Sequence, residues 1–176
     1  TFVFDKVSAE GVPLIYDRSP FPQMILEHVY LVGISSGIAI VIGVLSGVFV
    51  TRDFGRDFLP VVNSLSSLGQ TFPPVAVLAL AVPIVGFGAK PTILALLIYG
   101  LLPIIRNTIA GLEQVPASVL EAAKGMGMSR FQILWQIELP LSMKVIFAGV
   151  RTSTIINIGT ATLGATVGAG GLGAPI

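Results

Sequence analysis

The chain has 176 residues, of which 53% are hydrophobic and only 11% are charged, and its formal net charge at pH 7 is +1. Soluble domains carry about 25% charged residues, so this composition indicates a membrane protein, and the small net charge argues against nucleic-acid binding. The chain has no cysteine and one histidine, His28, which excludes disulfides and thiolate metal sites and disfavours a histidine metal site or a catalytic triad.

We interpret His28 as an interfacial residue, because it stands beside an apolar run. Residues 1–28 include Lys6, Arg18 and three prolines. They lack a basic start followed by an apolar core, so they do not resemble a signal peptide. We predict an extracytoplasmic segment over 1–28 and a transmembrane domain over 29–176.

Four apolar stretches are candidates for membrane spans, which need about 20 mostly apolar residues in a helix. They cover residues 30–50, 58–82, 91–105 and 139–167, the third being short. The sequence therefore predicts an all-α, polytopic bundle of membrane helices.

Glycines recur at four-residue spacing in the first span, as Gly33/Gly37 and Gly43/Gly47. Small residues at this spacing let helices approach closely in lipid, where packing drives their association. We expect both pairs to lie at helix contacts.

The second span is interrupted by Pro73-Pro74, which follow Gln70 closely. Proline removes a backbone donor and clashes with the preceding turn, so we expect a break in the helix. The break serves either packing or a transport path, since broken helices at membrane depth occur inside protein or along a cavity.

Basic residues indicate the orientation, because cytoplasmic loops carry more of them. Six lie in or near the predicted 51–57 and 106–144 connections, and three lie on the other side. The six are Arg52, Arg56, Arg106, Lys124, Arg130 and Lys144, and the three are Lys6, Arg18 and Lys90. We therefore predict that residues 111–138 are cytoplasmic and that the N-terminus is outside.

One face of the fourth span gathers small and polar residues. They are Gly149, Ser153, Asn157, Thr160, Gly164 and Gly168. This pattern fits a close helix–helix contact or the wall of a polar pathway. Arg151, in the same span, either faces protein or water within the membrane or snorkels to the interface.

The segment GAGGLG at 168–173 matches a dinucleotide-binding pattern. That pattern requires a strand before it and a helix after it, whereas a membrane helix precedes it here. No Walker A motif occurs in the sequence. We interpret these glycines as a tight turn that ends the fourth span.

Residues 111–138 predict a short amphipathic hairpin between the third and fourth spans. Pro116 suits the first turn of a helix, and Gly125 and Gly127 suit its end. Ser129 is a good N-cap for a second helix, and Pro140 then opens the fourth span. The apolar side chains expected at its surface are Phe131, Leu134 and Trp135. They face either lipid or a groove in a partner protein.

Seven residues of this region resemble the EAA motif of ABC-importer permeases, E-A-A-x3-G-x9-I-x-L-P. They are Glu121, Ala122, Ala123, Gly127, Ile137, Leu139 and Pro140. In that family this loop docks into a cleft on a separate ATPase subunit. The resemblance implies that Gly127 allows the close turn, that the two alanines seat the helix in the cleft, and that Glu121 anchors it.

Further stretches, among them YGLLPIIRNT and GAGGLG, resemble the permeases for quaternary-amine osmoprotectants such as glycine betaine, choline and carnitine. The resemblance runs from about residue 29 to the end. It implies the fold of a type I ABC importer permease, a multi-pass protein of the plasma or inner membrane. It also leads us to expect a further C-terminal span that this sequence lacks.

The partners that this resemblance implies are an ABC ATPase dimer, an extracytoplasmic substrate-binding protein, a second permease copy or paralogue, and membrane lipid. It implies no enzyme activity and no cofactor on this chain, because ATP and magnesium bind the ATPase. For the translocation path we select Gln70, Pro73, Pro74, Arg151, Asn157 and Thr160. The spans show no aromatic cage for an ammonium group, so we expect the binding protein to select the substrate.

Three other functions stay open. An ABC permease for methionine or another amino acid shares the fold and parts of these stretches. An ion-coupled carrier or channel would need intramembrane acids or inverted repeats, and the predicted spans show neither. A purely structural scaffold would not need the coupling hairpin.

Overall fold

The computed structural model describes residues 20–69 and 71–175, and every regular element in these two ranges is a helix. The predicted all-α architecture is confirmed there. In chain order the elements are α2 (Phe21–Val50), η1 (Arg56–Phe58), α3 (Leu59–Gly69), α4 (Pro74–Val85), α5 (Ala89–Glu113), α6 (Ala117–Gly125), α7 (Arg130–Ile133), the π-helical segment η2 (Leu134–Glu138), α8 (Leu139–Ala161) and η3 (Thr162–Val167).

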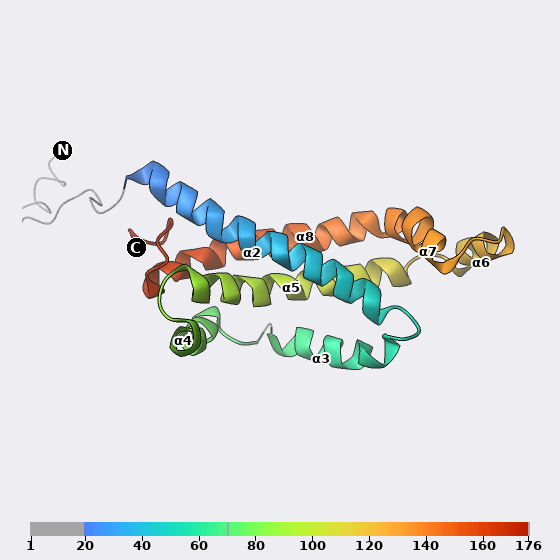
Figure 1. Ribbon diagram of the computed structural model, residues 1–176, viewed down its shortest axis with the longest axis horizontal. Helices are drawn as coiled ribbons and strands as arrows, with labels where there is room; N and C mark the ends of the chain where they lie inside the picture. Colours follow the sequence, from blue (N-terminus) through green and yellow to red (C-terminus); the bar gives the residue numbers. More distant parts are fainter. Residues whose placement is uncertain (1–19, 70, 176) are drawn as a thin grey trace, which may run out of the picture.

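Three helical runs are long and apolar enough to cross a membrane: α2, α5 and the continuous run Arg130–Val167. They lie side by side, and α5 packs against both α2 and α8 (Figure 1). Among the described residues this gives three spans by length and composition, where the sequence predicted four. The ends differ as well, because α5 continues to Glu113 and includes Arg106, which the prediction had placed in a connection.

The two ends of the bundle are built from distant parts of the chain (Figure 1). The 51–58 turn and the hairpin of α6 and α7 lie at one end, whereas the start of α2 and residues 168–175 lie at the other. The basic side chains of the turn and of the hairpin therefore share one end of the molecule.

The stretch predicted as a second span forms two short helices, α3 and α4. Pro73 is the N-cap of α4, with extended backbone angles (φ −66°, ψ 134°), and Pro74 is its first residue. Proline disfavours helix in the residue before it and cannot donate to the preceding turn, so the pair separates the two helices. At this break the hydroxyl of Tyr99 in α5 donates to the carbonyl oxygen of Phe72.

The two glycine pairs of α2 have different surroundings. A Cβ added at Gly43 would stand 2.7 Å from Cγ2 of Ile104, and one at Gly47 would stand 2.6 Å from Cβ of Thr108. The predicted close approach of another helix is confirmed there, and the helix is α5. Among the described residues, no atom lies within 4 Å of a Cβ added at Gly33 or Gly37, so in this part of the chain the prediction is wrong for them.

The contact between α5 and α8 is also close. A Cβ added at Gly149 would stand 2.6 Å from Cβ of Asn107, and one at Gly100 would stand 2.9 Å from the amide nitrogen of Asn157. Asn157 is fully buried and donates through Nδ2 to the hydroxyl of Ser36 in α2 at 3.1 Å. The helix-contact interpretation of this α8 face is confirmed.

The glycine cluster after η3 makes the tight turn that the sequence predicted. Gly168 ends η3 with φ +78°, a conformation that glycine adopts without steric cost. The N–H of Gly171 then donates to the Glu27 carboxylate at 3.0 Å. His28 is buried, with Nε2 3.1 Å from the carbonyl oxygen of Ile158. It is thus packed between α2 and α8, and its position at the membrane interface stays a prediction.

Candidate coupling surface and transport groove

The motif residues of α6 fall on two sides of the helix. Glu121 and Ala122 are exposed, whereas Ala123 is completely buried. Ala123 therefore packs in the interior of the hairpin. The prediction that both alanines are presented to a partner is wrong for Ala123. The outward surface of α6 carries the carboxylate of Glu121 beside the small side chain of Ala122.

α6 ends in a turn that requires glycine. Gly127 has φ +80°, and the N–H groups of Gly127 and Met128 donate to the carbonyl oxygens of Lys124 (2.9 Å) and Ala123 (3.1 Å). This pair of hydrogen bonds is a Schellman motif, in which the residue after the helix takes the left-handed conformation. The predicted stop is confirmed, with Gly125 as the last residue of α6.

The second helix of the hairpin starts at a reciprocal cap. The hydroxyl of Ser129 accepts from the N–H of Gln132 at 3.3 Å, and Oε1 of Gln132 accepts from the N–H of Ser129 at 2.8 Å. This capping box satisfies two backbone donors that a helix start leaves unpaired. The predicted N-cap at Ser129 is confirmed, and it fixes where the chain leaves the turn.

Pro140 does not begin a new helix, because the run from Arg130 passes through it into α8. Proline lacks an N–H, and its ring would press on the carbonyl four residues back, at Gln136. Here the helix widens into the π segment η2, in which the N–H of Leu139 reaches the carbonyl of Leu134. Such π turns relieve this conflict and are frequent at functional sites.

Two ion pairs connect this second helix to the turn after α2. Nη1 of Arg52 lies 2.7 Å from Oε2 of Glu138, and Nη1 of Arg130 lies 2.7 Å from Oδ2 of Asp53. The first pair is largely buried, with side-chain exposures of 23% and 10%, whereas the second is exposed at 89% and 75%. Sequence reasoning missed both, since Glu138 is an unspecified position of the motif and its partner lies 86 residues away.

An aromatic pair marks the outer surface of the hairpin. The ring centroids of Phe131 and Trp135 are 6.0 Å apart, and both side chains are more than half exposed. Met126, in the turn, is exposed as well, whereas Leu134 is only partly exposed. The predicted apolar surface is therefore confirmed for the two aromatic residues.

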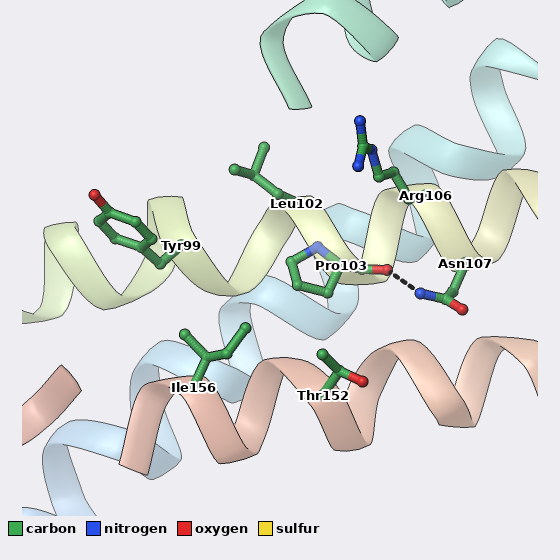
Figure 2. Close-up of a pocket in the computed structure, with 7 residues that line it drawn as sticks. All are labelled: Tyr99, Leu102, Pro103, Arg106, Asn107, Thr152 and Ile156. Carbon is green, nitrogen blue, oxygen red and sulfur yellow. Dashed lines mark hydrogen bonds between the residues drawn. The ribbon is translucent and has the colours of Figure 1, made fainter. Parts of the chain in front are cut away.

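A groove of about 520 Å³ opens between α5 and α8. Its lining residues are Tyr99, Leu102, Pro103, Arg106, Asn107, Thr152 and Ile156. Figure 2 shows Tyr99, Leu102 and Arg106 leaving α5 on one side, while Thr152 and Ile156 rise from α8 towards α5. In the part of the chain that the structure describes, no cluster of three His, Asp or Glu side chains could hold a metal ion.

The path residues selected from the sequence that the structure describes are not in the lining of this groove. Arg151 is exposed next to Thr152, Thr160 is half-buried, and Asn157 is fully buried between helices. Pro73 and Pro74 start α4, and Gln70 lies outside the described residues. Arg106 was missed because the apolar run was ended at residue 105. An arginine just beyond an apolar run was the available signal.

Comparison with known proteins places this arrangement among transporters. The model of a family described as "Binding-protein-dependent transport system inner membrane component" matches residues 39–176. The osmoprotectant import permease protein OsmY of Salmonella typhimurium is 46% identical over 147 residues, which cover 84% of this chain and 62% of that protein. The glycine betaine/carnitine/choline transport system permease protein OpuCB of Bacillus subtilis is 41% identical, with 84% and 67% covered.

A choline transport system permease protein of Bacillus subtilis, OpuBD, is 44% identical over 77% of this chain and 59% of its own length. The chain thus spans about 60% of the length of several curated relatives. Among solved structures, an inward-facing methionine ABC transporter, MetNI, matches with a TM-score of 0.73 and 26% identity, covering 88% of this chain and 77% of that one. The chain has the helical fold of the type I ABC importer permeases.

Proposed function

The chain belongs to the family of binding-protein-dependent transport system inner membrane components, and we propose from this premise that it is the permease subunit of an ATP-driven importer for quaternary-amine osmoprotectants such as glycine betaine, choline or carnitine. The observation that carries the proposal is the 46% identity over 147 residues to an osmoprotectant import permease. The methionine transporter is only 26% identical, which favours a quaternary amine over methionine as the substrate.

The ATPase contact lies on the outward side of the hairpin. Glu121 and Ala122 are exposed there, and the turn at Gly127 holds their helix against the second one. Ile137, Leu139 and Pro140 continue the motif through the π segment into α8. The partner ATPase dimer binds ATP and Mg²⁺, while this chain carries no catalytic residue and converts the partner's movement into movement of its helices.

The opposite end of the bundle receives the substrate. It consists of the start of α2, the 86–88 turn and residues 168–175 (Figure 1), and it faces an extracytoplasmic binding protein. The N-terminus is then outside and the hairpin is in the cytoplasm. This orientation is supported by the basic residues that gather at the hairpin end.

A second permease copy or a paralogue completes the path. Arg151 is exposed 12 residues into α8, about 18 Å along the helix from Leu139 at 1.5 Å per residue. A charge at that depth is costly in lipid and needs protein or water around it. The face of α8 that bears Arg151 therefore meets the other subunit or the path, with Thr160 further along the helix. The break at Pro73-Pro74 is a separate candidate for the path.

The test is uptake of labelled glycine betaine into proteoliposomes that contain the full-length permease, its ATPase and its binding protein. We expect uptake that requires ATP hydrolysis, is blocked by excess choline or carnitine, and is lost with Glu121→Lys. Glu113→Lys, an exposed acid at the end of α5, is the matched control and should transport normally.

Each alternative has its own signature in this assay. Uptake blocked by methionine and not by quaternary amines would keep the ABC machinery and discard the substrate. Uptake that ignores ATP but follows an ion gradient would point to a carrier or channel. Full transport by the Glu121 variant would discard the proposed docking surface.

A further inference from the structure

The 168–173 turn is held against the start of α2 by two neighbouring side chains (Figure 1). The carboxylate of Glu27 accepts from the N–H of Gly171 at 3.0 Å. His28, the next residue, is buried, and a Cβ added at Gly171 would stand 3.3 Å from its Nδ1 and 3.5 Å from its Cβ. A Cβ added at Gly170 would overlap the Glu27 carboxylate. We call these contacts of Glu27 and His28 with Gly170 and Gly171 the clasp.

The backbone conformation at the clasp also requires glycine. φ is +75° at Gly170 and +82° at Gly171, in the left-handed region that glycine enters without steric cost. Glycine also changes its backbone angles more freely than other residues, and hinges are a few positions that absorb such changes. The residues that let the turn approach α2 therefore also permit it to swing away.

The turn is tied to α5 by a backbone hydrogen bond and by tight packing. The N–H of Gly88, at the start of α5, donates to the carbonyl of Val167 at 2.7 Å. A Cβ added at Gly164 in η3 would stand 2.7 Å from Cγ2 of Thr92 in α5. On the α2 side, in contrast, the turn is held through the half-buried carboxylate of Glu27. Movement at this end would therefore separate the turn from α2 and keep it on α5.

His28 leaves the closed clasp with an unpaired polar atom. Its Nε2 lies 3.1 Å from the carbonyl oxygen of Ile158, which can only accept, so Nε2 carries the hydrogen. Its Nδ1 is buried and has no hydrogen-bond partner among the described residues. Such an atom carries a desolvation cost, which is relieved when water reaches it. The Glu27 hydrogen bond thus favours the closed clasp, whereas the buried Nδ1 favours opening.

We propose that the clasp closes the substrate-receiving end of the permease and opens when that end takes substrate from the binding protein. This inference rests on the proposed function, which assigns this end to the binding protein. In the closed form Glu27 connects α2 to the turn, and through the turn to α5. Opening frees α2 from the turn, while the hydrogen bond between Gly88 and Val167 keeps the turn on α5.

A disulfide tests whether the clasp must open during transport. The chain has no cysteine, and Cβ of His28 lies 3.5 Å from a Cβ placed at Gly171, at the short end of the range of about 3.5–4.5 Å for disulfides. The variant is His28→Cys with Gly171→Cys, in the full-length permease with its ATPase and binding protein in proteoliposomes. We expect mild oxidation to lower its glycine betaine uptake at least tenfold and dithiothreitol to restore it. The same oxidant should not change uptake by either single-cysteine variant.

A second experiment measures opening without a disulfide, and it decides the matter if the double variant does not fold. In His28→Cys alone the closed turn covers the thiol, so a polar thiol reagent labels the open form. Adding Glu27→Gln removes the charge of the acceptor, and charge-assisted hydrogen bonds are stronger than neutral ones. We expect labelling of the purified permease–ATPase complex in nanodiscs to become at least fivefold faster. Glu113→Gln, which removes an exposed acid at the other end of α5, is the matched control and should leave the rate unchanged.

The outcomes separate this inference from the proposed function. Full uptake with the disulfide formed would overturn the inference, because the clasp would then be static. Equal labelling with and without Glu27→Gln would show that this carboxylate does not hold the clasp closed, and would overturn it as well. The expected labelling rates in a complex that shows no ATP-driven uptake of glycine betaine would support the clasp and discard the importer.

Discussion

The backbone at Gly127 determines what the hairpin tolerates at the scale of single residues. Its φ is +80°, yet an added Cβ would meet no described atom within 4 Å, so a side chain would strain the backbone without a steric clash. That strain costs about 1–2 kcal/mol for an L-residue. We expect Gly127→Ala to speed hydrogen exchange at the Met128 amide, which donates to Ala123, by roughly five- to thirtyfold at 1.4 kcal/mol per factor of ten.

Gly125 is the matched control for this prediction. It also has open space for a Cβ, but it is helical, and its φ is not positive. Alanine in a helix is more favourable than glycine by about 0.5–1 kcal/mol, so Gly125→Ala should slow exchange slightly. Similar exchange in the two variants would show that the left-handed turn does not control the hairpin.

Residues whose role is local could be predicted from the sequence. The stop at Gly127 and the cap at Ser129 depend on neighbours within a few positions. The ends of α5 could not be predicted by counting apolar residues, because Asn107 donates to its own helix and Arg106 reaches a groove. Whether Ala123 points into the hairpin or out of it likewise depends on the packing of a second helix.

At the scale of the helix, the two glycine pairs of α2 give a direct comparison. Gly47→Leu would place a side chain where even a Cβ stands 2.6 Å from Thr108, and overpacking of this kind costs about 1–3 kcal/mol or more. We expect it to prevent accumulation of folded permease in the membrane. A Cβ added at Gly37 meets no described atom within 4 Å, so Gly37→Leu should accumulate normally, as measured by gel filtration of the detergent-solubilised protein.

If Gly37→Leu also failed to accumulate, the outward face of α2 would have to be packed against something in the assembled protein. If Gly47→Leu were tolerated, the tight contact between α2 and α5 would be wrong. The helix-scale prediction from sequence was incomplete for a physical reason. Four-residue spacing identifies a surface that permits close approach, but it does not say which neighbour fills it.

The buried ion pair between Arg52 and Glu138 links two elements that must move together if the hairpin drives the bundle. Removing one partner leaves the other charge without its ion pair, at a desolvation cost of roughly 1–3 kcal/mol. We expect Glu138→Gln to lower the amount of glycine betaine taken up per ATP hydrolysed, because the π segment no longer follows the turn after α2. Arg52→Glu combined with Glu138→Arg should restore part of this ratio, measured in proteoliposomes.

The exposed pair of Asp53 and Arg130 is the control, since it joins the same turn to the same continuous helical run at the same 2.7 Å. Surface pairs contribute about 0–1 kcal/mol, so Asp53→Asn should leave the ratio near that of wild type. An equal effect of Asp53→Asn and Glu138→Gln would show that burial does not matter. No effect of Glu138→Gln would remove the link from the coupling route.

At the scale of the whole molecule, the proposed function assigns a role to each end of the bundle, and the central question is which end faces the cytoplasm. The hairpin and the 51–58 turn share one end, and the 86–88 turn lies at the other (Figure 1). We propose from the excess of basic residues that the first end faces the cytoplasm. In the proposed importer ATP is hydrolysed at that end, so a test of the orientation is also a test of the coupling surface.

Cysteine labelling tests this directly, because the chain contains no cysteine of its own. Met126→Cys in the hairpin and Phe87→Cys at the opposite end replace side chains that are 73% and 78% exposed. With a membrane-impermeant thiol reagent on intact cells, we expect labelling of the Phe87 variant and none of the Met126 variant until the membrane is opened. The reverse pattern would invert the orientation and place the hairpin where no ATPase could reach it, while leaving the helical packing unchanged.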